Sequence, residues 1–129
     1  MKSRIPTALL KRAVLKTVGQ RRKVILAVLG PAEMARLNWR FLRHRGPTDV
    51  LAFPAGPGDP PGFLGEVAVC PAVARREARE RGIDWREELA RYVIHGCLHL
   101  LGYDDHIPKD RARMWKRQER VLASLKPLK

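Results

Sequence analysis

The pattern of apolar and polar positions along the chain predicts a few short strands set among amphipathic helices. Residues 23–30, KVILAVLG, form a short apolar run that is typical of a buried strand. Residues 49–54 (DVLAFP) and 63–70 (FLGEVAVC) are similar runs, and the turn-rich stretch AGPGDPPG separates them. Helices are predicted over residues 6–18, 31–37, 71–82 and 84–101, and from residue 108 onward. About three strands with helices around them indicate an α/β or α+β fold.

The helix over residues 84–101 carries the clearest signals. Asp84 is the expected N-cap, and Glu87 follows three residues later, which is the spacing of a capping box. Gly102 is expected to end the helix in the left-handed conformation. The apolar stripe that should face the core consists of Trp85, Leu89, Tyr92, Gly96 and Leu100. Because Gly96 falls in the middle of this stripe, we expect the helix to approach the sheet closely there.

The end of this helix holds a candidate metal site. Residues 95–106, HGCLHLLGYDDH, contain three of the four histidines of the chain. His95 and His99 stand four residues apart on one helix face, which is the geometry that two imidazoles need to reach one metal ion. The turn at Gly102 should bring further donors back towards the pair, namely Asp104, Asp105 and His106. An imidazole-rich set suits one zinc ion, with nickel and copper as alternatives. The structural alternative is a histidine pair that binds no metal and interacts favourably with the helix dipole.

Length and charge narrow the class of protein. At 129 residues, the chain is expected to form a single domain over residues 1–129. The 26 Lys and Arg residues exceed the 13 Asp and Glu residues, for a formal net charge of +13. Such an excess predicts a nucleic-acid partner, with a merely solvated basic surface as the alternative. No apolar run is long enough for a membrane span or a secretory signal, so neither is expected.

The two cysteines have no spacing that indicates a disulfide framework. Cys70 and Cys97 are therefore interpreted as reduced thiols of a cytosolic protein. Cys97 points about 200° away from His95 on an ideal helix, so it is not expected to bind the metal.

Three segments, in this order, resemble a known family. PTDVLAFP (residues 47–54), LGEVAVC (64–70) and HGCLHLLGYDDH (95–106) are similar to signature segments of the YbeY family of bacterial rRNA maturation factors. The resemblance implies a metal-dependent endoribonuclease that acts on single-stranded RNA, in maturation of the 16S rRNA 3′ end and in ribosome quality control. It implies RNA and the small ribosomal subunit as partners, a cytoplasmic location, and one Zn²⁺ held by three histidines, of which His95 and His99 are two. No membrane and no dinucleotide cofactor is expected.

The resemblance also refines the fold. It implies a small three- to four-stranded mixed sheet packed with about five helices, with the metal site at the C-terminal end of a central helix. The leading strand that is usual in the family is missing or very short in this sequence, which favours three strands.

Two departures from the family pattern affect individual residues. The position of the family's third histidine is Asp105 here, and His106 comes one residue later. His106 is the preferred third ligand because imidazole is the commonest metal ligand, and Asp105 is the alternative. An arginine that many family members carry before the P-T-D segment is Leu42 here, so that role cannot be transferred. Arg43 and Arg45 are neighbouring candidates for RNA binding.

The chemistry is expected to be metal-assisted cleavage of an RNA phosphodiester bond. The residue that acts as base is unknown from the sequence, and the candidates are Asp104, Asp105 and Glu66. Arg91, one helical turn before His95, is a further candidate for contact with RNA. The alternative is that Arg91 pairs with nearby glutamates of the same helix.

Two other classes of function compete with this interpretation. The first is a non-catalytic RNA- or ribosome-binding module with a structural zinc, which would need a fourth protein ligand. The second is a metalloprotease-like hydrolase. It is disfavoured because Gly96 stands where proteases of the H-E-x-x-H type carry the glutamate that acts as general base.

Overall fold

A three-stranded mixed sheet forms the centre of the structure, a computed structural model that describes residues 4–128. The strands are β1 (Lys23–Val28), β2 (Val50–Pro54) and β3 (Phe63–Val69), in the order β1-β3-β2. β1 runs parallel to β3, with Val24 opposite Gly65, and β2 runs antiparallel to β3, with Val50 opposite Val69. β2 is therefore an edge strand, and one side of its backbone is not paired within the sheet.

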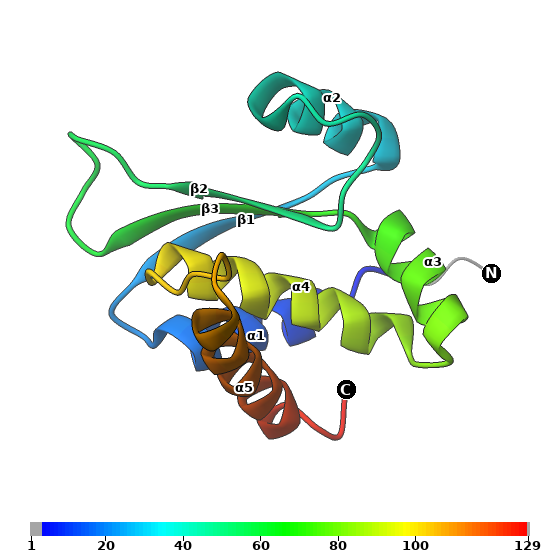
Figure 1. Cartoon of the computed structure of the whole chain (residues 1–129). Helices are drawn as coiled ribbons and strands as arrows, with labels where there is room; N and C mark the ends of the chain where they lie inside the picture. The colour runs from blue at the N-terminus through cyan, green and yellow to red at the C-terminus, as the bar shows by residue number, and fades with distance from the viewer. Residues whose placement is uncertain (1–3, 129) are drawn as a thin grey trace.

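Five helices pack on this sheet within the described residues. They are α1 (Thr7–Val18), α2 (Pro31–Leu42), α3 (Pro71–Arg81), α4 (Trp85–Leu100) and α5 (Pro108–Ser124). Figure 1 shows α2 on one face of the sheet and α4 on the other, with α1, α3 and α5 grouped around α4. The expected α+β fold, with three strands and about five helices, is confirmed. None of these helices is long and apolar enough to cross a membrane.

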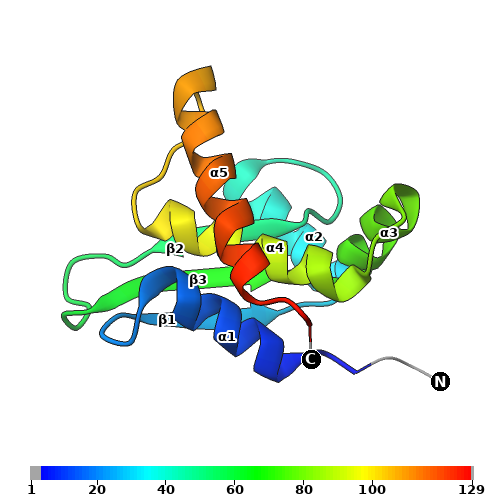
Figure 2. The same cartoon turned by 90° about the horizontal axis from the view of Figure 1, so that it is seen from below.

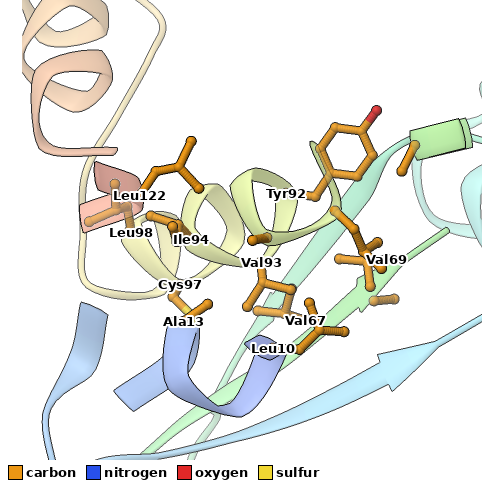
Figure 3. Packing of buried hydrophobic residues seen from close by; sticks show 14 of the residues in the cluster. Leu10, Ala13, Val67, Val69, Tyr92, Val93, Ile94, Cys97, Leu98 and Leu122 are labelled. Atoms are coloured by element: carbon orange, nitrogen blue, oxygen red, sulfur yellow. The ribbon is translucent and has the colours of Figure 1, made fainter. Parts of the chain in front are cut away.

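The central position of α4 comes from burial on several of its sides. Figure 3 shows Val93 and Cys97 pointing towards α1, while Ile94 and Leu98 lie beside Leu122 of α5. These four residues of α4 are fully buried. The predicted stripe is therefore too narrow, since Trp85 and Leu100 are only partly buried whereas other sides of the helix are enclosed. A helix that is apolar around most of its surface is typical of a central position in the core.

Gly96 is the point of closest approach between α4 and the sheet. A Cβ atom at this position would lie 2.6 Å from Cγ1 of Val67 and 3.0 Å from Cγ2 of Val50. Such distances are shorter than van der Waals contacts between carbon atoms allow. The close packing that the sequence predicted at Gly96 is confirmed.

Two helix boundaries differ from the prediction in an informative way. α2 continues to Leu42, five residues beyond the predicted end, because no glycine or proline interrupts it before Gly46. Asp84 caps α4 as expected, and its carboxylate accepts the backbone N–H of Arg86 at 2.9 Å. Glu87 does not complete a capping box, since its carboxylate pairs with Arg91 and Lys126.

Candidate metal centre

The C-terminal turns of α4 bring two imidazoles together. Nε2 of His95 and Nε2 of His99 lie 3.1 Å apart. On the opposite side of each ring, Nδ1 of His95 lies 2.8 Å from Oε1 of Gln118 on α5, and Nδ1 of His99 lies 3.1 Å from the carbonyl oxygen of Tyr103. Each histidine is therefore held by one ring nitrogen and presents the other to a shared point.

The hydrogen-bond partners fix the tautomer of both rings. The carbonyl oxygen of Tyr103 can only accept, so the hydrogen of His99 is on Nδ1. The amide nitrogen of Gln118 donates to Oε2 of Glu119 at 3.1 Å, which directs Oε1 towards His95 and makes Nδ1 of His95 the donor. In the neutral rings, both Nε2 atoms then carry lone pairs that face each other. Two lone pairs at 3.1 Å repel, and a cation between them removes the repulsion.

Asp105 completes a set of three donors. The chain turns at Gly102, which has a φ of +101°, and returns Asp105 to the imidazoles. One carboxylate oxygen, Oδ2, lies 3.6 Å from Nε2 of His99 and 3.8 Å from Nε2 of His95. Tetrahedral zinc with ligand bonds of about 2.0–2.1 Å separates its ligand atoms by about 3.3–3.5 Å. The observed spacing is close to this, so His95, His99 and Asp105 could hold a metal ion.

His106 takes a different position from the one preferred on sequence grounds. Its side chain is 85% exposed, and its Nδ1 lies 3.7 Å from Oδ1 of Asp104 and 4.0 Å from Oδ1 of Asp105. Its backbone N–H donates to Oδ1 of Asp104 at 2.8 Å. The structure thus brings Asp105 to the histidine pair and leaves the ring of His106 exposed beside Asp104 and Asp105. Which of the two binds a metal ion stays a prediction.

A groove leads from α2 to the metal centre. It has a volume of about 700 Å³, and its walls include Phe41 and Leu42 at the end of α2, the whole of β2, His99, and the loop that follows α4. Because β2 is an edge strand, the groove crosses the open side of the sheet. An elongated substrate can therefore reach the histidines from the face of the sheet that α2 covers.

The motifs and the fold agree with one protein family. Residues 2–126 match the family model described as Endoribonuclease YbeY. This chain belongs to the YbeY endoribonuclease family. The match covers nearly the whole sequence, so the resemblance seen in three segments is confirmed over the full fold.

Relatives in the YbeY family differ in length. A protein of Chlorobium luteolum named Endoribonuclease YbeY is 40% identical over 126 residues, which are 95% of this chain and 90% of the relative. One of the same name from Frankia casuarinae is 42% identical over 105 residues, but this chain spans only about half of it, 52%. A solution structure from Thermotoga maritima superimposes with a TM-score of 0.65 at 33% identity, covering 93% of this chain and 78% of the other.

Glu66, one of the candidate bases, does not lie at the candidate metal centre. Side chains alternate along a strand, and its neighbour Val67 faces Gly96 of α4. Glu66 therefore points to the opposite face, where it lines a second groove beside α2 with Glu33 and Phe41. Of the three candidates for the base, only Asp104 and Asp105 line the groove that contains His99.

The guanidinium of Arg91 forms ion pairs with carboxylates. The structure therefore supports the ion-pairing alternative for Arg91 and not a contact with RNA. Its side chain is 11% exposed and pairs with Glu87, Glu88 and Glu119. Burial alone would lower the pKa of Arg91, but the hydrogen bonds with Glu119 and Glu88 outweigh it and raise the pKa. Arg91 also holds Glu119, which in turn orients the amide of Gln118.

Gln118 contacts the candidate metal centre and was missed by the sequence interpretation. It is 5% exposed and belongs to the buried face of α5, which also carries Met114, Val121 and Leu122. A polar residue at helical spacing within an apolar stripe was the available signal, because a buried amide needs a partner.

Cys97 behaves as expected from the sequence. It is fully buried, and burial raises the pKa of its thiol to about 12, so the thiol remains protonated at neutral pH. Arg43 and Arg45 are exposed beside Trp39 at the end of α2, which adjoins the groove.

Proposed function

We propose that this chain is a metal-dependent endoribonuclease that cleaves RNA phosphodiester bonds, and that His95, His99 and Asp105 hold its metal ion. The observation that carries the proposal is the pair of Nε2 atoms, 3.1 Å apart, with the Asp105 carboxylate beside them and a groove of about 700 Å³ that reaches them. Membership of the YbeY endoribonuclease family and the net charge of +13 support RNA as the substrate.

Zinc is the proposed metal, because two imidazole nitrogens and one carboxylate oxygen are a common ligand set of catalytic zinc. When bound, the ion supplies Lewis-acid polarisation of a phosphoryl oxygen. Three protein ligands would leave a fourth position for the substrate. Asp104, whose carboxylate is 52% exposed on the groove wall, is the proposed acceptor for the proton of the attacking oxygen.

The proposed cellular role is maturation of the 16S rRNA 3′ end and quality control of the small ribosomal subunit in the cytoplasm. The resemblance of the three signature segments supports this role. The basic surface supports it too, because rRNA presents a dense array of phosphates.

Cleavage of an rRNA fragment that contains the 16S 3′ end tests the proposal. With the metal restored and at low salt, His99→Ala is expected to lower the cleavage rate by at least about 100-fold, since metal ions contribute several kcal/mol to such reactions. His44→Ala is the matched control, because His44 is exposed and does not line the groove. Equal cleavage by the wild type and His99→Ala would contradict the proposal.

The structural-zinc alternative has a separate test. X-ray absorption of the zinc-loaded protein counts the protein ligands of the ion. Three protein ligands and one exchangeable position are expected. A closed sphere of four protein ligands, with His106 as the fourth, would favour a binding module over an enzyme.

A further inference from the structure

The last turn of α2 presents large apolar side chains to solvent. Trp39, Phe41 and Leu42 are 46%, 53% and 50% exposed. Side chains of this kind are usually buried, and a cluster of them on a surface marks a contact site. Figure 1 shows that α2 lies on the face of the sheet opposite to α4 and its neighbours, so this turn is not part of the main core.

Arginines surround these aromatic rings. The guanidinium carbons of Arg43 and Arg45 lie 5.4 Å and 5.6 Å from the ring centroid of Trp39. That of Arg40 lies 5.5 Å from the ring centroid of Phe41. Residues 38–46 contain no acidic side chain. The combination of exposed aromatic rings with unopposed arginines matches the chemistry of nucleotides, which have a planar base and an anionic phosphate.

The backbone holds this cluster in place. Arg43 caps α2 in the left-handed region, with φ 57° and ψ 28°, which is uncommon for a residue other than glycine. Its N–H donates to the carbonyl oxygen of Trp39 at 3.0 Å. Asn38 is 4% exposed, and its side-chain Nδ2 donates to the carbonyl oxygen of Gly46 at 2.9 Å, which fastens the loop to the helix.

The cluster adjoins the groove of the candidate metal centre through Leu42, which follows Trp39 by three residues and so lies beside it on α2. Trp39 itself does not line that groove. Phe41 and Leu42, which belong to the same helical turn as Trp39, line the groove together with His99 and Asp105. Phe41 also packs edge-on against Phe53 of β2, with ring centroids 5.0 Å apart. An RNA strand with one phosphate at the metal centre can therefore run across β2 and reach this turn.

We propose that Trp39 forms a base-stacking subsite for RNA, where one unpaired base stacks on the indole and Arg43 and Arg45 bind the adjoining phosphates. The inference rests on the proposed function, because it assumes that RNA is the substrate. Stacking of a base on an aromatic ring is stronger than an exposed cation–π contact. An incoming base therefore displaces a guanidinium from the indole, and the arginine turns to the phosphate that accompanies the base.

Binding of an intact RNA and of an abasic RNA separates stacking from charge. Both are unpaired, equally long and fluorescently labelled, but one lacks several internal bases. Affinity is measured by anisotropy with the full-length His99→Ala protein, so that neither RNA is cleaved. When Trp39→Ala is combined with His99→Ala, binding of the intact RNA is expected to weaken about tenfold, and binding of the abasic RNA should stay nearly unchanged. Trp39→Phe in the same His99→Ala background should retain most of the preference for intact RNA.

Trp115 provides the matched control. It is an equally exposed tryptophan, at 53%, on the basic helix α5 and does not line the groove. Trp115→Ala should keep the preference for intact RNA, whereas Arg43→Ala and Arg45→Ala should weaken binding of both RNAs to a similar extent. An equal loss for both RNAs in Trp39→Ala, no loss at all, or the same loss in Trp115→Ala would overturn the subsite.

The binding test of the Trp39 subsite and the cleavage test of the proposed function can fail separately. If the wild-type protein fails to cleave RNA but Trp39→Ala abolishes the preference for bases, only the proposed function fails. If the wild type cleaves RNA but Trp39→Ala has no effect on binding, only the subsite fails.

Discussion

The chemistry of the two imidazoles depends on side chains that do not themselves reach the metal position. Arg91 holds the carboxylate of Glu119, Glu119 accepts from the amide of Gln118, and Gln118 accepts from Nδ1 of His95. Each step fixes the orientation of the next group. The last step sets the tautomer in which Nε2 of His95 carries a free lone pair.

Replacing Gln118 tests this chain of contacts. Gln118→Ala is expected to weaken zinc binding by about 10–100-fold, the usual effect of losing a partner of a metal-binding histidine. Competition with a chromophoric chelator measures the affinity. Gln20→Ala serves as the control, since Gln20 is exposed in the turn between α1 and β1. An unchanged affinity in Gln118→Ala would show that the tautomer is set in another way.

The choice between Asp105 and His106 can be made on the same assay. Because Oδ2 of Asp105 faces both Nε2 atoms and the His106 ring is 85% exposed, Asp105→Ala should cause the larger loss. We expect that loss to exceed about 100-fold, which is more than a residue outside the coordination sphere contributes. The absorption spectrum of the cobalt-substituted protein should change in the same variant. A larger loss of zinc affinity in His106→Ala would show that His106 is the third ligand, as the sequence favoured.

Among the elements, α4 combines structural and functional roles. Its middle is enclosed by the sheet, α1, α3 and α5, and its last two turns carry the imidazoles. The helix can lie this close to β3 only because Gly96 has no side chain. The position of the histidines relative to the groove therefore depends on a packing contact at the adjacent residue.

A methyl group at this contact should be costly. In Gly96→Ala, the new Cβ would lie 2.6 Å from Cγ1 of Val67, which is fully buried. Overpacking costs about 1–3 kcal/mol, and the better helix propensity of alanine recovers at most about 1 kcal/mol. We expect the free energy of unfolding in urea to fall by about 1–2 kcal/mol. Gly56→Ala, at a loop position with free space, should leave it nearly unchanged, and equal stability of both variants would contradict the packing argument.

At the scale of the whole molecule, the sequence predicted elements well wherever burial and end signals agreed. Residues 84–101 were predicted as a helix and α4 spans Trp85–Leu100, because the N-cap and the glycine after the helix are both explicit. The end of α2 was missed because Arg40, Phe41 and Leu42 are largely exposed. A pattern that assigns apolar residues to the core has no means of describing a helical turn that faces solvent.

The candidate site was predictable only where it is local in sequence. The four-residue spacing of His95 and His99 and the turn at Gly102 define most of it. Gln118 comes from a different helix, so its contact depends on how α4 and α5 pack. Glu66 remained among the candidate bases because the sequence does not reveal which face of β3 meets α4.

The net charge of +13 leads to a prediction for the whole molecule. If three or more phosphates are neutralised, log affinity for single-stranded RNA should fall with log salt with a slope of about −2 or steeper. This corresponds to a loss of more than about tenfold between 50 and 200 mM salt. Filter binding at several salt concentrations measures the slope. An affinity that does not change with salt would contradict the prediction that the positive charge drives RNA binding.

A paired variant shows which basic residues contribute to that slope. Arg43→Ala/Arg45→Ala should reduce its magnitude by about 1.4, since each neutralised phosphate contributes about 0.7. Lys11→Ala/Lys16→Ala, on the exposed side of α1, removes the same charge far from the groove in sequence and should change the slope less. Equal changes would mean that the basic surface acts as a whole.

The contact between Gln118 and His95 would also make the resistance of the protein to proteolysis depend on metal binding. Figure 2 shows the first turns of α5 extending beyond the rest of the molecule, with the helix anchored by its later turns. If release of α5 weakens metal binding about 10–100-fold, reciprocity requires that a bound metal ion raises the cost of that release by about 1.4–2.7 kcal/mol. A chain that has lost its metal would therefore open at α5 about 10–100 times more often, and it would be the first to be degraded by proteases.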